Sequence, residues 1–330
     1  MPDPFQYLIS LLAAFGATLV AVVGAGWILR SWAGQLASAI GVFAVSTGLT
    51  VGYGVLHFEW VWPPANAINR FLTLVLPATV VVELISGLAA IPTNPDARHS
   101  KVAGFFLVLT MILRLGLFIC IGRILLHNSV YLGASPGEND AWSNRQTFII
   151  LIAGAVALGA AWRLLSSLAN RAGSGSVVAS LSISIMAAGL AIMLAGYIKG
   201  GVATFPISAA LMGTIAFCPM VRRDRCATNG RYFHGPIGIG IAALFSLLWI
   251  GCFFGQLRAV DAVVIFMAPL LCWISERSVF RGMNGSRKVL LRLTAVAIPL
   301  LVVLLNAKRS FDQKLAPLVA DAAQAFENSF

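Results

Sequence analysis

The segment FLTLVLPATVVVELISGLAAI, residues 71–91, has the length of a membrane-spanning helix, yet it contains a carboxylate, Glu83, near its middle. A helix needs about 20 mainly apolar residues to cross the hydrocarbon core of a bilayer. A charged side chain at that depth costs about 2.5–3.5 kcal/mol on insertion scales, and it usually marks a pair or a functional site. This segment therefore indicates both the fold class and the first candidate site.

The composition of the whole chain indicates the same class. Of the 330 residues, 59% are hydrophobic and 11% are charged, whereas about a quarter of the residues in a soluble domain are charged. Water could not solvate the surface of such a chain, but a bilayer could. We therefore predict an all-α, polytopic integral membrane helix bundle.

Runs of about 20 apolar residues predict about ten transmembrane helices. They lie near residues 5–29, 34–56, 71–91, 102–126, 147–169, 177–198, 202–220, 237–256, 260–276 and 289–307. The pair 177–198 and 202–220 is joined only by Lys199, Gly200 and Gly201, which permits either a tight helical hairpin or a re-entrant element. We assign residues 1–307 to a single transmembrane domain.

Residues 308–330 form a separate element in this interpretation. Phe311, Leu315, Leu318, Ala322 and Phe326 recur at helical spacing, which predicts a short amphipathic C-terminal tail lying on the membrane surface. Membrane lipids are the expected partners of the chain as a whole. The tail also suits a contact with a protein partner.

Lysine and arginine are divided unequally between alternate loops. One set of loops, which includes RRDRCATNGR (222–231) and ERSVFRGMNGSRK (276–288), is the richer in basic residues. The positive-inside rule places this set in the cytoplasm and both termini on the outer face of the plasma (inner) membrane, although Lys308 and Arg309 after the last span argue against it. The net charge of +11 lies beside the spans, which suits anionic lipid headgroups rather than nucleic acid.

The motifs in the chain give little support to an enzyme. The stretch GASPG (133–137) matches G-x-S-x-G, but it lies in a polar loop rather than at the strand-to-helix turn that activates such a serine. Cys218, Cys226 and His234 are spaced too widely for the common zinc patterns. No pair of mid-membrane histidines is available for a haem. We predict no catalytic residue, no metal and no cofactor.

The charges inside the spans are the candidate site residues. Glu83 lies roughly 12 Å from the inner end of its helix, and Arg114 lies roughly 16 Å into the next helix. Consecutive spans with a short connection pack as antiparallel neighbours, so we predict that Glu83 and Arg114 form a pair. The pair is either a structural contact that fixes the register of two helices or, with Lys199, part of a substrate or ion pathway.

Two features favour the pathway. Pro77 can free a carbonyl within the Glu83 helix, and YIKGGVATFP (197–206) could supply the unwound backbone that carriers use for binding. The second half of the chain, however, contains no acidic helix that matches the first.

The function that suits these observations best is a permease for a small solute or a lipid. The alternative is a non-catalytic membrane subunit that scaffolds or assembles a larger complex, and a lipid-modifying enzyme comes third. A permease should have a wet central cavity that reaches Glu83, whereas a subunit should have that position sealed.

Overall fold

The computed structural model describes residues 4–28, 36–58, 60–89, 101–132, 142–171, 174–216, 230–276, 280 and 283–314. Every element of regular secondary structure in these ranges is helical. Ten helical segments within them are long and apolar enough to cross a membrane. The prediction of an all-α polytopic membrane protein is therefore confirmed.

Each predicted span coincides with a helix whose ends differ from the prediction by a few residues. The spans are α1 (Pro4–Ile28), α2 (Ala37–Val55), the continuous α3–η1–α4 segment (Ala67–Arg70, Phe71–Val75 and Leu76–Ala89), α5 (Lys101–Leu126), α6 (Asn144–Arg171), α7 (Ser174–Leu194), α8 with α9 (Ile198–Val202 and Thr204–Ala216), α11 (His234–Phe254), α12 with η5 (Ala259–Met267 and Ala268–Glu276) and α13 (Gly285–Lys314). Two short helical turns, η3 (Val130–Leu132) and η4 (Gly230–Phe233), lie between spans.

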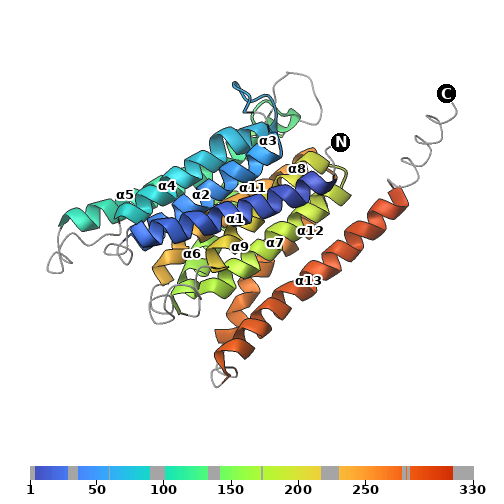
Figure 1. Ribbon diagram of the computed structural model, residues 1–330. Helices are drawn as coiled ribbons and strands as arrows, with labels where there is room; N and C mark the ends of the chain where they lie inside the picture. Colours follow the sequence, from blue (N-terminus) through green and yellow to red (C-terminus); the bar gives the residue numbers. More distant parts are fainter. Residues whose placement is uncertain are drawn as a thin grey trace.

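Helix α11 is the centre of the bundle. It packs against α2, α4, α6 and α7. Of the residues in its apolar stretch, 78% are buried inside the protein. Its sequence is apolar on all sides, which is typical of a helix surrounded by other helices. In α1 and α13 only 22% of the residues in the apolar stretch are buried, so these helices lie at the periphery. Helix α13 runs along the outside of the bundle beside α7 (Figure 1).

Small residues allow α1, α2 and α9 to approach closely. A Cβ at Gly48 would lie 2.7 Å from the carbonyl oxygen of Ala14, and one at Gly52 would lie 2.8 Å from the Cβ of Pro206. Because the hydrophobic effect does not drive helices together inside a bilayer, close van der Waals packing of this kind is a main source of helix association there.

Residues 174–216 form a helical hairpin, because α7 and the α8–α9 segment are each long enough to span and pack against each other. The backbone N–H groups of Gly196 and Tyr197 donate to the carbonyls of Met193 and Ile192, which ends α7. Gly196 has a φ of 86°, a conformation that glycine adopts without steric cost at a helix C-terminus. The hairpin alternative is thus confirmed.

The predicted unwound backbone at 197–206 is wrong except at two residues, Tyr197 and Ala203. The chain is helical from Ile198 to Val202 and again from Thr204, and only Ala203 breaks the helix. Pro206 has no N–H to donate to the carbonyl of Val202. The carbonyl of Ala203, the residue at the break, accepts a hydrogen bond of 2.7 Å from the Tyr53 hydroxyl of α2.

The span that contains Glu83 begins at Ala67, four residues earlier than predicted, and passes through a π-helical turn at Phe71–Val75. Asn66 caps its start by accepting a hydrogen bond of 2.9 Å from the backbone of Asn69. The π turn lies directly before Pro77, which cannot donate to the carbonyl of Thr73. Single π turns of this kind relieve a local break in the helical hydrogen-bond ladder.

Helix α1 begins and α13 ends at the same end of the bundle, called here the terminal end (Figure 1). Which side of a membrane this end faces stays a prediction. Helix α13 continues to Lys314, seven residues beyond the predicted end of the span. The remainder of the tail, the GASPG stretch and the basic stretch 222–229 lie outside the described residues.

Candidate functional site

Glu83 of α4 and Arg114 of α5 form the predicted pair. Arg114 donates from Nε to Oε1 of Glu83 over 2.9 Å and from Nη2 to Oε2 over 2.6 Å. Two parallel N–H···O bonds between a guanidinium and a carboxylate make the strongest and most directional ion pair available to side chains. The contact holds α4 and α5 at one register.

Two further helices close the site around this pair. Glu83 is 2% exposed, and a Cβ added at Gly238 of α11 would overlap its carboxyl group. The carboxylate therefore lies directly against the backbone of α11. On the other side, the guanidinium carbon of Arg114 lies 4.5 Å from the centre of the Trp162 ring of α6, within the range of a cation–π interaction.

The third predicted site residue is elsewhere. Lys199 is an exposed residue of α8, which packs on α7, α9 and α11, whereas Glu83 and Arg114 lie on α4 and α5. The structure therefore brings together two of the three predicted residues. Both oxygens of the Glu83 carboxylate accept hydrogen bonds from Arg114, and the pair carries no net charge. This arrangement suits a contact that holds two helices together better than a site that exchanges a proton or an ion.

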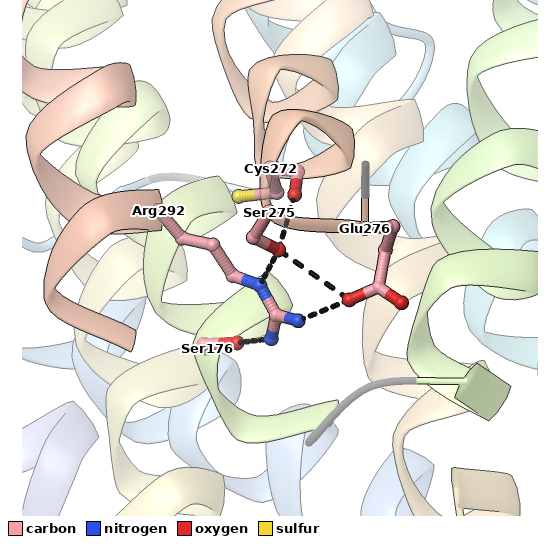
Figure 2. A network of polar contacts seen from close by, with 5 residues as sticks. All are labelled: Ser176, Cys272, Ser275, Glu276 and Arg292. Carbon is pink, nitrogen blue, oxygen red and sulfur yellow. Dashed lines mark hydrogen bonds and ion pairs between the residues drawn. The ribbon is translucent and has the colours of Figure 1, made fainter. Parts of the chain in front are cut away.

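Arg292, a buried arginine inside a span, is not among the predicted site residues. Arg292 of α13 is 3% exposed, and its guanidinium reaches three described partners (Figure 2). It donates to the Ser275 hydroxyl over 2.6 Å, to the Ser176 hydroxyl over 2.7 Å and to Oε1 of Glu276 over 2.7 Å. These side chains come from η5 and from the first turn of α7, at the end of the bundle opposite the terminal end.

The local backbone explains how η5 supplies two of these partners. Pro269 cannot donate to the carbonyl of Ile265, and the chain continues from Ala268 to Glu276 as a 3₁₀ helix. A run of this length is uncommon and often marks a functional or strained segment. The sequence contains a signal for the site, since Arg292 is a charged residue inside the predicted span 289–307.

An apolar groove of about 450 Å³ runs between α1 and α13. Its walls are Leu11 and Phe15 of α1 and Leu301 and Leu304 of α13, and its floor is formed by α7 and α9, with Met186, Leu190 and Met212 among the lining residues. Ser182 and Ser208 lie on the floor, where their hydroxyls are 2.9 Å apart and each donates to the other's backbone carbonyl. The groove therefore presents almost only carbon to its contents.

A smaller pocket of about 140 Å³ lies at the terminal end of the same helices. Its lining includes the polar residues Gln256, Arg258, Asp261 and Ser310, together with Phe311. The backbone N–H of Gln256 donates to the carbonyl of Ala195 over 3.2 Å, which fixes this loop against the end of α7.

The groove and the pocket follow one seam. On α7 the lining residues Ile183, Met186 and Leu190 of the groove continue into Leu194 of the pocket, at spacings of three and four. On α13 the lining residues Leu300 and Leu304 continue into Ala307 and Phe311 in the same way. Because residues at these spacings share one face of a helix, the two cavities lie in line along α7 and α13.

No family model matches this chain, and no curated protein and no solved structure is detectably similar to it.

Proposed function

We propose that this protein is a lipid permease whose substrate moves along the seam between α7 and α13. The observation that carries the proposal is the apolar groove between α1 and α13. Pockets of 300–1,000 Å³ with mainly hydrophobic walls and few polar groups are typical ligand sites. This groove has that size and composition.

The position of the groove favours a lipid over a small polar solute. Its two walls belong to the peripheral helices, and the neighbouring side chains Leu12 and Leu305 are exposed, so they face the acyl chains of the bilayer. An amphiphile could enter sideways from the membrane without crossing water. The groove floor offers two serine hydroxyls that already donate to each other's backbone carbonyls, which suits an acyl chain and not an ion.

The centre of the bundle gives less support to a solute pathway. Helix α11 fills it, and Glu83 is covered by Gly238 and held by Arg114. These contacts support the structural interpretation of the Glu83–Arg114 pair.

Lipid exchange between leaflets tests the proposal. The full chain would be reconstituted into liposomes that contain a fluorescent phospholipid, and the fraction accessible to a membrane-impermeant quencher would be followed over time. We expect faster exchange than in protein-free liposomes. Ala187→Trp, which fills the groove floor, should slow exchange, whereas Leu305→Trp, which faces lipid on α13, should not. Exchange at the protein-free rate, or equal rates for both variants, would contradict the proposal.

The alternative of a non-catalytic membrane subunit is favoured by one observation, the sealed Glu83–Arg114 pair. A subunit needs rigid, fully neutralised contacts rather than a path. In that case the chain should migrate in mild detergent as part of a larger hetero-complex, and the liposome assay should show no exchange.

A further inference from the structure

We infer that the seam binds a phospholipid with a phosphate–ammonium headgroup, with an acyl chain in the groove and the headgroup in the pocket beside Arg258 and Asp261. This inference names the substrate class of the proposed permease and rests on that function. Binding, however, can be measured without transport.

The length of the seam fits one leaflet. From Ser182 in the groove to Ala195 in the pocket, α7 advances by roughly 20 Å at 1.5 Å per residue. Half of the hydrocarbon core of a bilayer is about 15 Å thick. The groove therefore spans roughly the depth of an acyl chain, and the pocket lies at the level of a headgroup.

The two ends of the seam differ in chemistry as the two parts of a phospholipid differ. In the groove the polar atoms are the Ser182 and Ser208 hydroxyls, which are already paired. The residues that line the pocket instead include an arginine, an aspartate, a glutamine and a serine. A ligand that is apolar over its length and polar at one end matches both cavities at once.

The charges in the pocket indicate which headgroup fits. Among the described residues the ion pairs are Arg114–Glu83 and Arg292–Glu276, and neither Arg258 nor Asp261 takes part in them. A guanidinium matches the geometry of a phosphate, and a carboxylate accepts hydrogen bonds from an ammonium group. One cation and one anion in the same pocket complement a zwitterion, whereas a purely anionic headgroup would leave Asp261 as an unfavourable neighbour.

Helix capping explains part of this arrangement but not all of it. Asp261 lies in the first turn of α12, where the helix dipole favours a carboxylate. That account says nothing of Arg258, which precedes the helix and would be unfavourable at its positive end. The pairing of both charges around one pocket is what points to a ligand.

Lipid binding to the delipidated full chain provides the test. Native mass spectrometry in detergent would compare phosphatidylethanolamine with phosphatidylglycerol of the same acyl chains. We expect a preference of about tenfold for phosphatidylethanolamine, the size of one good charged contact. Arg258→Gln should weaken binding of both lipids, and Asp261→Asn should abolish the preference by reducing only phosphatidylethanolamine binding. Ala187→Trp should abolish binding of both, and Arg309→Gln, an exposed change at the same end, should alter neither.

The controls separate this inference from its alternatives. Each variant would first be checked for an unchanged unfolding transition in detergent. Equal retention of both lipids by the wild type, or a preference unaffected by Asp261→Asn, would overturn the inference. A dimer that dissociates in Ala187→Trp would overturn it as well, because a second copy would then occupy the seam.

Binding and transport fail in different ways. A headgroup preference without lipid exchange in liposomes would leave the binding site standing and remove the permease. Lipid exchange that is insensitive to Arg258→Gln and Asp261→Asn would leave the permease standing and overturn the headgroup assignment.

Discussion

Arg114 and Arg292 are both arginines of membrane-spanning helices whose side chains are largely enclosed, with 13% and 3% of the side chain exposed, yet their surroundings differ. Arg114 is neutralised by both oxygens of one carboxylate whose side chain is 3% exposed, and an indole ring covers it. Arg292 is bonded to two hydroxyls and to one oxygen of Glu276, whose side chain is 28% exposed. These are the partners of Arg114 and Arg292 among the residues that the structure describes.

Depth explains the difference. Arg114 lies in the middle of α5, whereas Arg292 is seven residues from the start of α13 at Gly285. Far from water, an ionised group needs a complete counter-charge. Near the end of a span, hydroxyl groups and a half-solvated carboxylate are sufficient, because long cationic side chains also gain from nearby water.

The largest expected effect comes from Glu83→Gln. The change leaves the half-buried Arg114 guanidinium without a counter-charge inside the span, and breaking an enclosed pair in this way costs about 3 kcal/mol. Unfolding in mixed detergent micelles would measure the loss. The double variant with Arg114→Gln should recover much of it, because neither charge then remains. Additive losses would show that the two residues do not act as a pair.

Gly238→Ala should destabilise the same region by about 2 kcal/mol. The new Cβ would overlap the Glu83 carboxyl group, so α11 must move away from α4 or the bidentate contact must distort, and overpacking of this kind costs about 1–3 kcal/mol. Gly116→Ala on α5 is the matched control, since no atom lies within 4 Å of its added Cβ. It should be neutral or slightly stabilising. The same unfolding assay compares the two, and equal effects would show that Gly238 contributes only helix propensity.

Trp162→Phe should cost about 1 kcal/mol through a weaker cation–π contact with Arg114. Among the described residues the indole Nε1 has no hydrogen-bond partner, so the substitution removes no hydrogen bond and tests the ring itself. In an Arg114→Gln background the same substitution should have a smaller effect on the unfolding transition. An unchanged effect there would assign the loss to packing alone.

The spans and the Glu83–Arg114 pair could be predicted because each rests on a local rule. Hydropathy over about 20 residues decides a span, and the cost of an isolated charge in a neighbouring span demands a partner. The correct pairing followed from the adjacency of two consecutive helices.

The Arg292 cluster and the groove could not be predicted in the same way. Ser176 lies 116 positions before Arg292 in the chain, so their contact depends on how α7 and α13 pack. The groove depends on the spacing of four helices, which hydropathy does not encode. The π turn before Pro77 and the 3₁₀ helix that contains Pro269 lie where a proline interrupts the α-helical hydrogen bonds. The sequence shows where the prolines are, but it does not show which helical form the backbone adopts beside each of them.

Glu276→Gln should have the smallest effect, less than about 1 kcal/mol in the same unfolding assay. Its side chain is partly solvated, and a pair near water contributes little net free energy. The glutamine oxygen can still accept the hydrogen bond from Nη2 of Arg292, while Ser275 and Ser176 continue to accept the other two. The informative quantity is the loss of unfolding free energy in Glu276→Gln compared with that in Glu83→Gln. Each substitution removes one negative charge from one of the two ion pairs described for this chain. A loss for Glu276→Gln as large as that for Glu83→Gln would show that depth does not separate the two sites. A clear difference would mean that the bundle tolerates an incompletely neutralised cation near the end of a span but not at its middle.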